Sequence, residues 1–247
     1  MSIKHPGELE QLKTIGAIVG RSLEKLATYV KPGVRTAELD SLCARMLEDE
    51  GAQPSPPRVY NFPGAICISV NDEAIHGIPG DYVIQPGDLV KLDLTAEKNG
   101  FVADAAINVN VFPSRPEAVT LAACAENAFR KALAEVRPGC RIYEIGRAVE
   151  SEVNRQGFSV MRALCGHGVG RAIHEEPQVP NYPDPRTRGT LTEGLVFTIE
   201  PIISAGSGEA EFGSDGWTIR TVDRSLTAHY EHTVVVTHNE PILLTAC

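Results

Sequence analysis

The 247-residue chain contains no hydrophobic run that approaches the roughly 18 apolar residues of a membrane-spanning helix. Residues 1–16 show no apolar signal core and become helical almost at once, so a secretion signal is not expected. No CxxC pair occurs either. The cysteines are scattered at Cys43, Cys67, Cys124, Cys140, Cys165 and Cys247. This pattern is typical of reduced thiols in a protein core, and it argues against a disulfide framework or a zinc ribbon. We therefore expect a soluble, cytoplasmic protein.

Basic residues are outnumbered: 23 Lys and Arg face 32 Asp and Glu, which gives a formal net charge of -9. Binding to nucleic acid depends on clustered Lys and Arg, so neither a nucleic-acid nor a membrane partner is expected. A coiled coil is also missing, and we expect a monomer. The surplus of acid is compatible with a solvated surface or with a metal site built from several carboxylates.

The two halves of the chain repeat each other in three places. Residues 30–35 (VKPGVR) recur as residues 136–141 (VRPGCR), and residues 74–79 (AIHGIP) recur as residues 172–177 (AIHEEP). Residues 87–93 (GDLVKLD) have their counterpart in residues 194–200 (GLVFTIE). Because the three matches keep their order and spacing, we infer a duplicated unit: a helix, a loop with a histidine, and a strand that ends in a carboxylate.

Periodicity and chain breakers predict an α+β fold with a largely antiparallel sheet. The predicted helices cover residues 8–30, 36–50, 116–136 and 142–156. The predicted strands cover residues 66–70, 89–95, 101–112, 195–203 and 231–237. We expect one catalytic domain over residues 1–247, with internal repeats at roughly 8–112 and 116–237. Pro54, Pro56 and Pro57 indicate a stiff loop, present only in the first half, that could wall a pocket.

Carboxylates stand on or at the ends of several apolar strands. Asp93 and Asp104 flank a hairpin turn at residues 98–100, and this spacing predicts that they face each other across two strands. Facing like charges destabilise a strand pair unless a cation lies between them; the alternative is that one aspartate points to solvent. Glu200 occupies the place of Asp93 in the second repeat, and Glu231 begins another apolar strand.

Histidines accompany these carboxylates. His167 lies between glycines in CGHGVG, where the backbone and a metal ion can approach closely. Four carboxylates and one imidazole suit two bridged Mn, Fe(II), Co or Zn ions better than a structural zinc. His76 and His174 hold equivalent places in the two repeats. Each is either structural or a proton donor or acceptor beside the metals.

Three other features of the sequence, a glycine-rich segment, two cysteines and the single tryptophan, each have a simple structural explanation. The glycines at 166, 168 and 170 do not form a dinucleotide-binding motif, because no strand tipped with an acidic residue follows at the right distance. Cys67 and Cys165 are expected to pack in the core and not to act as nucleophiles, because nothing nearby marks a low-pKa thiolate. Trp217 is either a core ring or a cover over the pocket, and we favour the cover.

Taken in order, NDEAIHGIP, KLDLT, FVADA, CGHGVGRAIHEEPQVP, FTIEPI and DGWTIRTVDRSLTAHYEHTVVVT resemble type I methionine aminopeptidases over nearly the whole chain. The resemblance implies the pita-bread fold: duplicated halves with pseudo-twofold symmetry and a central curved antiparallel sheet covered by helices. It further implies a metallo-aminopeptidase of the cytoplasm that removes the first methionine from nascent proteins, with a transient ribosome contact.

The resemblance also implies roles for individual residues. The ligands of two divalent ions (Co, Mn, Fe(II) or Zn) would be Asp93, Asp104, His167, Glu200 and Glu231, with Asp104 and Glu231 bridging. His76 would contact the peptide nitrogen or leaving amine, His174 the scissile carbonyl oxygen, and Glu200 would carry the proton. Cys67, Phe62 and Trp217 would line the methionine pocket.

The chain departs from the family pattern at four positions. An aromatic residue is usual at Ile173, tyrosines of the methionine pocket are usual at Val59 and Phe62, and a threonine or serine is usual at Ala105. These departures leave the ligands intact and bear on how strictly methionine is selected. Two rival functions share the fold. An Xaa-Pro aminopeptidase or dipeptidase has the same five ligands but usually a further N-terminal domain, and a non-catalytic pita-bread binding protein has usually lost ligands.

Overall fold

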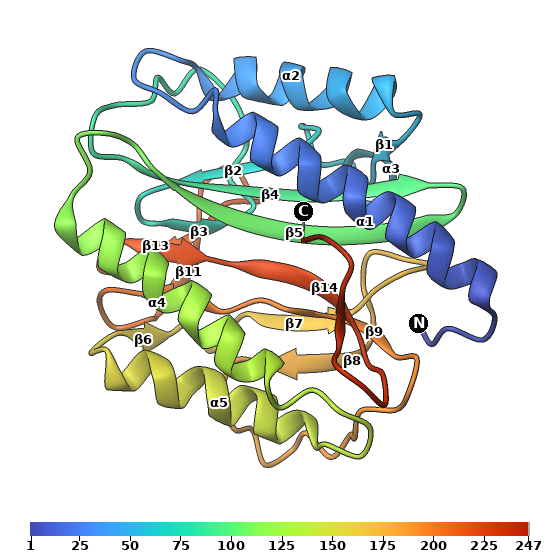
Figure 1. Cartoon of the computed structure of the whole chain (residues 1–247). Helices are drawn as coiled ribbons and strands as arrows, with labels where there is room; N and C mark the ends of the chain where they lie inside the picture. Colours follow the sequence, from blue (N-terminus) through green and yellow to red (C-terminus); the bar gives the residue numbers. More distant parts are fainter. Residues whose placement is uncertain (247) are drawn as a thin grey trace.

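The computed structural model describes residues 1–246 (Figure 1); the prediction for Cys247 lies outside these residues. Within them the helices are α1 (Pro6–Ala27), α2 (Thr36–Asp49), α3 (Pro56–Tyr60), α4 (Pro116–Leu133) and α5 (Ile142–Arg155). The four long helices confirm the prediction, and their ends shift by at most three residues. α1 starts early because Pro6 suits the first helical turn and the Glu8 carboxylate accepts the N–H groups of Lys4 and His5.

The strands pair antiparallel throughout residues 1–246, which confirms the α+β prediction. The large sheet has the order β1-β4-β5-β14-β9-β7-β8, with β2 also paired to β4 and β15 to β14. Its strands are β1 (Gln53–Pro54), β2 (Cys67–Val70), β4 (Leu89–Lys98), β5 (Phe101–Asn110), β7 (Cys165–Gly168), β8 (Glu175–Pro180), β9 (Val196–Ile199), β14 (Glu231–Val235) and β15 (Ile242–Leu243). Two small sheets comprise β6 (Ser159–Val160), β10 (Ile202–Ser204) and β13 (Thr227–His229), and β3 (Glu73–Ile75), β11 (Ala210–Phe212) and β12 (Ile219–Thr221).

The single strand predicted at residues 195–203 is wrong, because the structure has two strands there. β9 pairs with β14 in the large sheet, and β10 pairs with β13 and β6 in a small one. Pro201 lies between them and has no N–H for a sheet hydrogen bond, which explains the break. Glu200, just after β9, therefore sits where the chain leaves the large sheet. The stiff loop predicted near Pro56 is also different, since it forms the short helix α3.

The β4–β5 hairpin differs from the prediction in its register. Asp104 faces Thr95, and Asp93 faces Ala106, so the two aspartates are diagonal neighbours and not directly opposite. The cause is the turn: only Asn99 and Gly100 connect the strands, both with positive φ (55° and 78°), and this two-residue turn fixes the pairing. All four facing residues still share one side of the sheet.

Strand alternation separates the core from a polar face. In β4, Leu92, Leu94 and Ala96 are fully buried in the hydrophobic core, while Asp93 and Thr95 between them line a pocket. β5 repeats this pattern, with Ala103 and Ala105 in the core and Asp104 in the pocket. One side of the hairpin therefore packs against helices, and the other carries the candidate site.

Two helix pairs cover the core side. α1 packs on β4 and β5, and α4 and α5 cover the half that contains β9 and β14 (Figure 1). Each pair forms its own cluster of buried apolar residues, as a duplicated unit would. Within residues 1–246 no helix combines the length and apolarity required to cross a bilayer, and the five cysteines there carry free thiols.

Candidate metal centre

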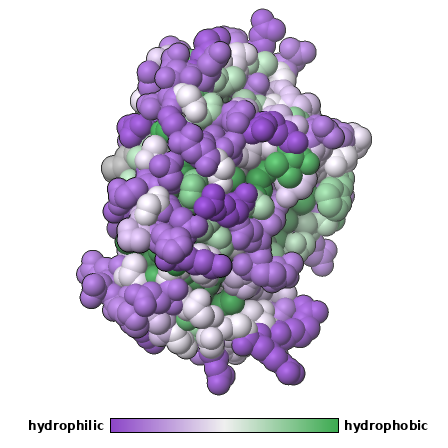
Figure 2. All heavy atoms as spheres, turned by 90° about the vertical axis from the view of Figure 1, so that its right-hand side faces the viewer, coloured by the Kyte–Doolittle hydropathy of each residue, from purple (hydrophilic) through white to green (hydrophobic). Residues whose placement is uncertain are grey.

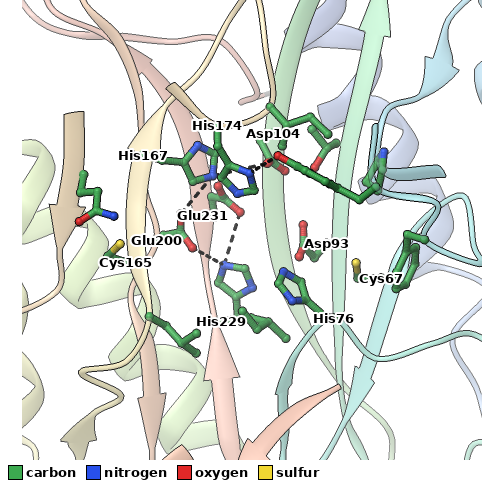
Figure 3. Close-up of a pocket in the computed structure, with 18 of the residues that line it drawn as sticks. Cys67, His76, Asp93, Asp104, Cys165, His167, His174, Glu200, His229 and Glu231 are labelled. Atoms are coloured by element: carbon green, nitrogen blue, oxygen red, sulfur yellow. Dashed lines mark hydrogen bonds and ion pairs between the residues drawn. The ribbon is translucent and has the colours of Figure 1, made fainter. Parts of the chain in front are cut away.

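A cavity of about 750 Å³ opens on the polar side of the large sheet. It brings together every site residue predicted from the sequence (Figure 3). These are Phe62, Cys67, His76, Asp93, Asp104, His167, His174, Glu200, Trp217 and Glu231. They come from both halves of the chain, so the site forms only when the two repeats pack together.

The aspartates belong to β4 and β5. Burial raises the pKa of Asp104 to about 6, and it raises the pKa of Asp93 well above the usual value, with the nearby Asp104 carboxylate adding to the shift. The Asp104 backbone is fixed by Thr233, whose hydroxyl accepts from its N–H (2.9 Å) and donates to its carbonyl (2.8 Å). Two carboxyl groups are thus held close together away from water.

The glutamates approach from β9 and β14. Thr198 donates a 2.9 Å hydrogen bond from Oγ1 to Glu200 Oε1, and Asn181 Nδ2 donates to the Glu200 carbonyl (2.8 Å). Burial is the main cause that raises the pKa of Glu200 and of Glu231 well above the usual value, and the neighbouring carboxylates raise both further. Like charges gathered in a buried site require compensation by a cation or by protons.

His167 reaches this group from β7. Its Nε2 lies 3.5 Å from Glu200 Oε1 and 3.9 Å from Asp104 Oδ2. The glycines on either side allow this approach: a Cβ at Gly166 would stand 2.6 Å from the Thr198 carbonyl oxygen, and one at Gly168 would stand 2.2 Å from the Glu176 carbonyl oxygen. The His167 N–H donates to Thr198 Oγ1 (3.0 Å), so one hydroxyl orients both His167 and Glu200.

These donors fit divalent metal ions. Asp104 Oδ1 and Glu231 Oε1 are buried without a hydrogen-bond partner in the described part of the chain, although buried oxygens normally have one. Asp104, His167 and Glu231 present ligand atoms within 4.8 Å of one another, and so do Glu200, His229 and Glu231. Oxygen ligands with imidazole nitrogen suit Mn, Fe(II), Co or Zn.

The two repeated histidines line the same cavity. His76 has a positive φ of 57°, which is uncommon for a residue with a side chain, and burial lowers its pKa to about 4. His174 packs its ring against that of His167, with centroids 4.3 Å apart, and its Nδ1 lies 2.7 Å from Tyr60 Oη. Burial lowers the pKa of His174 as well. Neutral imidazoles therefore stand beside the carboxylates.

An apolar wall closes one side of the cavity. Phe62 and Trp217 meet edge to face, with centroids 5.3 Å apart and ring planes at 84°. Cys67 lies in the same lining, and burial raises its thiol pKa well above the usual value, which fits the expectation that it is not a nucleophile. Ile173 also belongs to the lining.

Two of the four family departures lie away from the cavity, whereas Ile173 and Phe62 line it. Val59 is 57% exposed on α3 and does not line the pocket; Tyr60, which the sequence analysis passed over, does. Ala105 faces the helices, on the opposite side of β5 from Asp104, so it affects core packing and does not touch the site.

His229 is a further residue of the site, and it was not among the predicted site residues. It is 2% exposed, at the end of β13, and its Nε2 lies 3.4 Å from Glu231 Oε2 and 3.9 Å from Glu200 Oε2. Burial lowers its pKa to about 3. The signal was present in the sequence, because His229 stands two residues before Glu231 and strand alternation places such residues on one face.

Comparison with known proteins agrees with this geometry. Residues 10–238 match the model of metallopeptidase family M24. The chain is 42% identical to methionine aminopeptidase 2 of Bacillus subtilis, with 99% of each chain covered. The structure of the methionine aminopeptidase from Thermotoga maritima superposes with a TM-score of 0.96 at 34% identity and full coverage of both chains.

A prolidase from Pyrococcus furiosus has a TM-score of 0.80 at 23% identity, and the match covers 65% of that chain, so this likeness concerns the fold alone. The fold and the carboxylate-rich centre are those of a metallopeptidase, and the chain belongs to metallopeptidase family M24. Its near relatives within the family are methionine aminopeptidases. The predicted pita-bread fold and the predicted family are confirmed.

Proposed function

We propose that this chain is a methionine aminopeptidase that hydrolyses the first peptide bond of peptides and nascent proteins and releases their N-terminal methionine. The observation that supports the proposal is that four carboxylates and three histidines predicted from the sequence line one cavity. The relatives named methionine aminopeptidase, which are similar over nearly the whole chain, support the same substrate class.

Five residues would hold two divalent metal ions, Co, Mn, Fe(II) or Zn: Asp93, Asp104, His167, Glu200 and Glu231. When bound, such a pair supplies Lewis acidity and lowers the pKa of a water molecule, so that it attacks an amide at neutral pH. Glu200 is suited to move the proton. Its Oε1 is held by Thr198, and a carboxylate fixed in this way could take a proton from the attacking water and return it to the leaving amine.

The repeated histidines act on the peptide. His174, oriented by Tyr60 at 2.7 Å, donates a hydrogen bond to the scissile carbonyl oxygen, where negative charge develops in the transition state. His76, held by its unusual backbone conformation, contacts the peptide nitrogen and then the leaving amine. Both rings remain neutral near pH 7 because burial lowers their pKa values, so neither adds a positive charge that would repel the metals.

Phe62, Cys67 and Trp217 would receive the methionine side chain. An aromatic edge-to-face pair beside a sulfur atom makes an apolar surface that a flexible thioether can fill. The free α-amine of a substrate would bind one of the metal ions, which would limit cleavage to the first residue.

Both repeats contribute ligands to one site, so we also propose that residues 1–247 act as one catalytic domain. The enzyme would work as a cytoplasmic monomer and meet nascent chains during a transient ribosome contact. The face shown in Figure 2 is mostly hydrophilic, and its apolar residues gather mainly between the centre and the right-hand edge of the view.

A peptide panel tests the proposal. The protein is loaded in turn with Mn, Co, Fe(II) under anaerobic conditions, and Zn, and the free amino acid released from Met-Ala-Ser and from Xaa-Pro peptides is measured. Methionine release from Met-Ala-Ser, abolished by Glu231→Ala, is expected. Preferential cleavage of Xaa-Pro peptides would assign the chain to the rival peptidases of this fold. Metal binding without any hydrolysis would point to a binding protein.

A further inference from the structure

His229 lies on the opposite side of the glutamate pair from His167 (Figure 3). Its backbone N–H donates to Asn108 Oδ1 (3.1 Å), which fixes the end of β13. Neither ring nitrogen has a hydrogen-bond partner in the described part of the chain, although the side chain is almost fully buried. A buried imidazole with both nitrogens unpaired is rare, and it calls for a ligand.

The distance from Nε2 to Glu231 suits a shared cation better than a hydrogen bond, and Glu200 lies somewhat farther away. Nε2 lies 3.4 Å from Glu231 Oε2 and 3.9 Å from Glu200 Oε2. Two ligand atoms bound at about 2.1 Å to one ion stand roughly 3.0–3.4 Å apart, whereas a charge-assisted N–H···O bond measures about 2.7–2.9 Å. His167 shows nearly the same spacings, 3.5 Å and 3.9 Å, to its own two carboxylates.

We propose that His229 binds metal through Nε2 as a sixth protein ligand, grouped with Glu200 and Glu231. The proposal rests on the metal centre of the proposed function and adds a second nitrogen donor to it. Each histidine would then serve one side of the site, with Glu231 shared between the two ligand groups. Because imidazole favours Zn and Co over Mn more than carboxylate does, a second imidazole shifts the centre toward Zn and Co.

The matched variants are His229→Gln and His232→Gln. Glutamine at position 229 keeps an N–H donor for Glu231 but removes the imidazole. The variant can therefore still donate a hydrogen bond, but it lacks the nitrogen that is proposed to bind metal. His232 is a buried histidine on the same stretch of chain, and its ring nitrogens lie near Thr245 Oγ1 (2.8 Å) and Tyr230 Oη (3.1 Å), away from the cavity. It controls for the loss of a buried ring.

Two measurements decide the question. In crystals of the zinc-loaded wild-type protein, anomalous scattering should place a zinc ion about 2.0–2.1 Å from His229 Nε2. In chelator-competition titrations, His229→Gln should weaken Zn binding by at least about tenfold and Mn binding by less, while His232→Gln leaves both unchanged.

A zinc ion beyond hydrogen-bond range of Nε2, or Zn binding by His229→Gln equal to that of the wild type, would overturn the proposal. If His229→Gln does not fold, the crystal of the wild-type protein alone decides. Methionine release from Met-Ala-Ser is measured on the same samples. Release without zinc at His229 refutes only this sixth ligand, whereas zinc at His229 without release refutes only the proposed aminopeptidase activity.

Discussion

Replacing Thr198 with valine should disrupt the centre without touching a ligand. Thr198 is fully buried; its Oγ1 accepts from the His167 N–H (3.0 Å) and donates to Glu200 Oε1 (2.9 Å). Valine has nearly the same shape, so no cavity forms. The His167 N–H left without a partner costs about 1–3 kcal/mol, and loss of the bond to Glu200 adds about 1.5 kcal/mol. We expect the free energy of unfolding of the metal-free protein to fall by about 2.5–4.5 kcal/mol.

The same change should weaken metal binding by about 10–100-fold, because groups that orient metal ligands typically contribute that much. Urea unfolding measures the first effect, and calorimetric titration with Zn measures the second. Thr221→Val is the control: this fully buried threonine donates to the Ser225 carbonyl away from the cavity, so it should lose about 1 kcal/mol and bind metal normally. Thr198→Ser should recover both properties. Wild-type metal affinity in Thr198→Val would refute the role of this hydroxyl.

Three further outcomes are expected. Tyr60→Phe removes the 2.7 Å contact with His174 and should lower kcat for Met-Ala-Ser roughly fivefold with little change in KM; a change in KM alone would contradict the orienting role. Trp217→Ala removes the ring that packs against Phe62 and should reduce kcat/KM for methionine peptides about tenfold or more, mainly through KM. An unchanged preference for methionine over alanine at the first position would show that Trp217 does not form the methionine pocket. Metal affinity should increase as pH rises from about 5 to about 7, because the metal-free Asp104 carboxyl has a pKa raised to about 6 and must lose its proton to bind; calorimetry showing pH-independent affinity would contradict this.

Much of the fold could be predicted because local signals and the fold agree. The long helices carry strong apolar periodicity, and one of them begins at a residue that fits a first turn, Pro116. The short strands β7 and β8 were missed because their sequence, with Gly166, Gly168 and Pro180, favours loops. They form because β7 pairs with β9 on one side and with β8 on the other, and the two glycines allow this close approach. Such pairing is a tertiary effect that a local stretch of sequence does not reveal.

The candidate site was predictable in its membership more than in its geometry. The duplication singled out Asp93 and Glu200 because equivalent places in two repeats reinforce each other. His229 has no counterpart of this kind, and its role depends on how β13 turns into β14. The register of the β4–β5 hairpin could not be predicted from the alternation of apolar and polar residues either. It depends on which two residues form the turn, and these are Asn99 and Gly100, both with positive φ.

The most direct test of the central claim is the number of metal ions bound per chain, measured by elemental analysis after loading and desalting. The claim is that carboxylates and imidazole from both repeats hold a pair of cations. It predicts two ions in the wild-type protein, and weaker or incomplete loading when Asp93, one of the five proposed ligands, becomes asparagine. A folded wild-type protein that retains no metal, or an Asp93→Asn variant that retains two ions as tightly as the wild type, would contradict it.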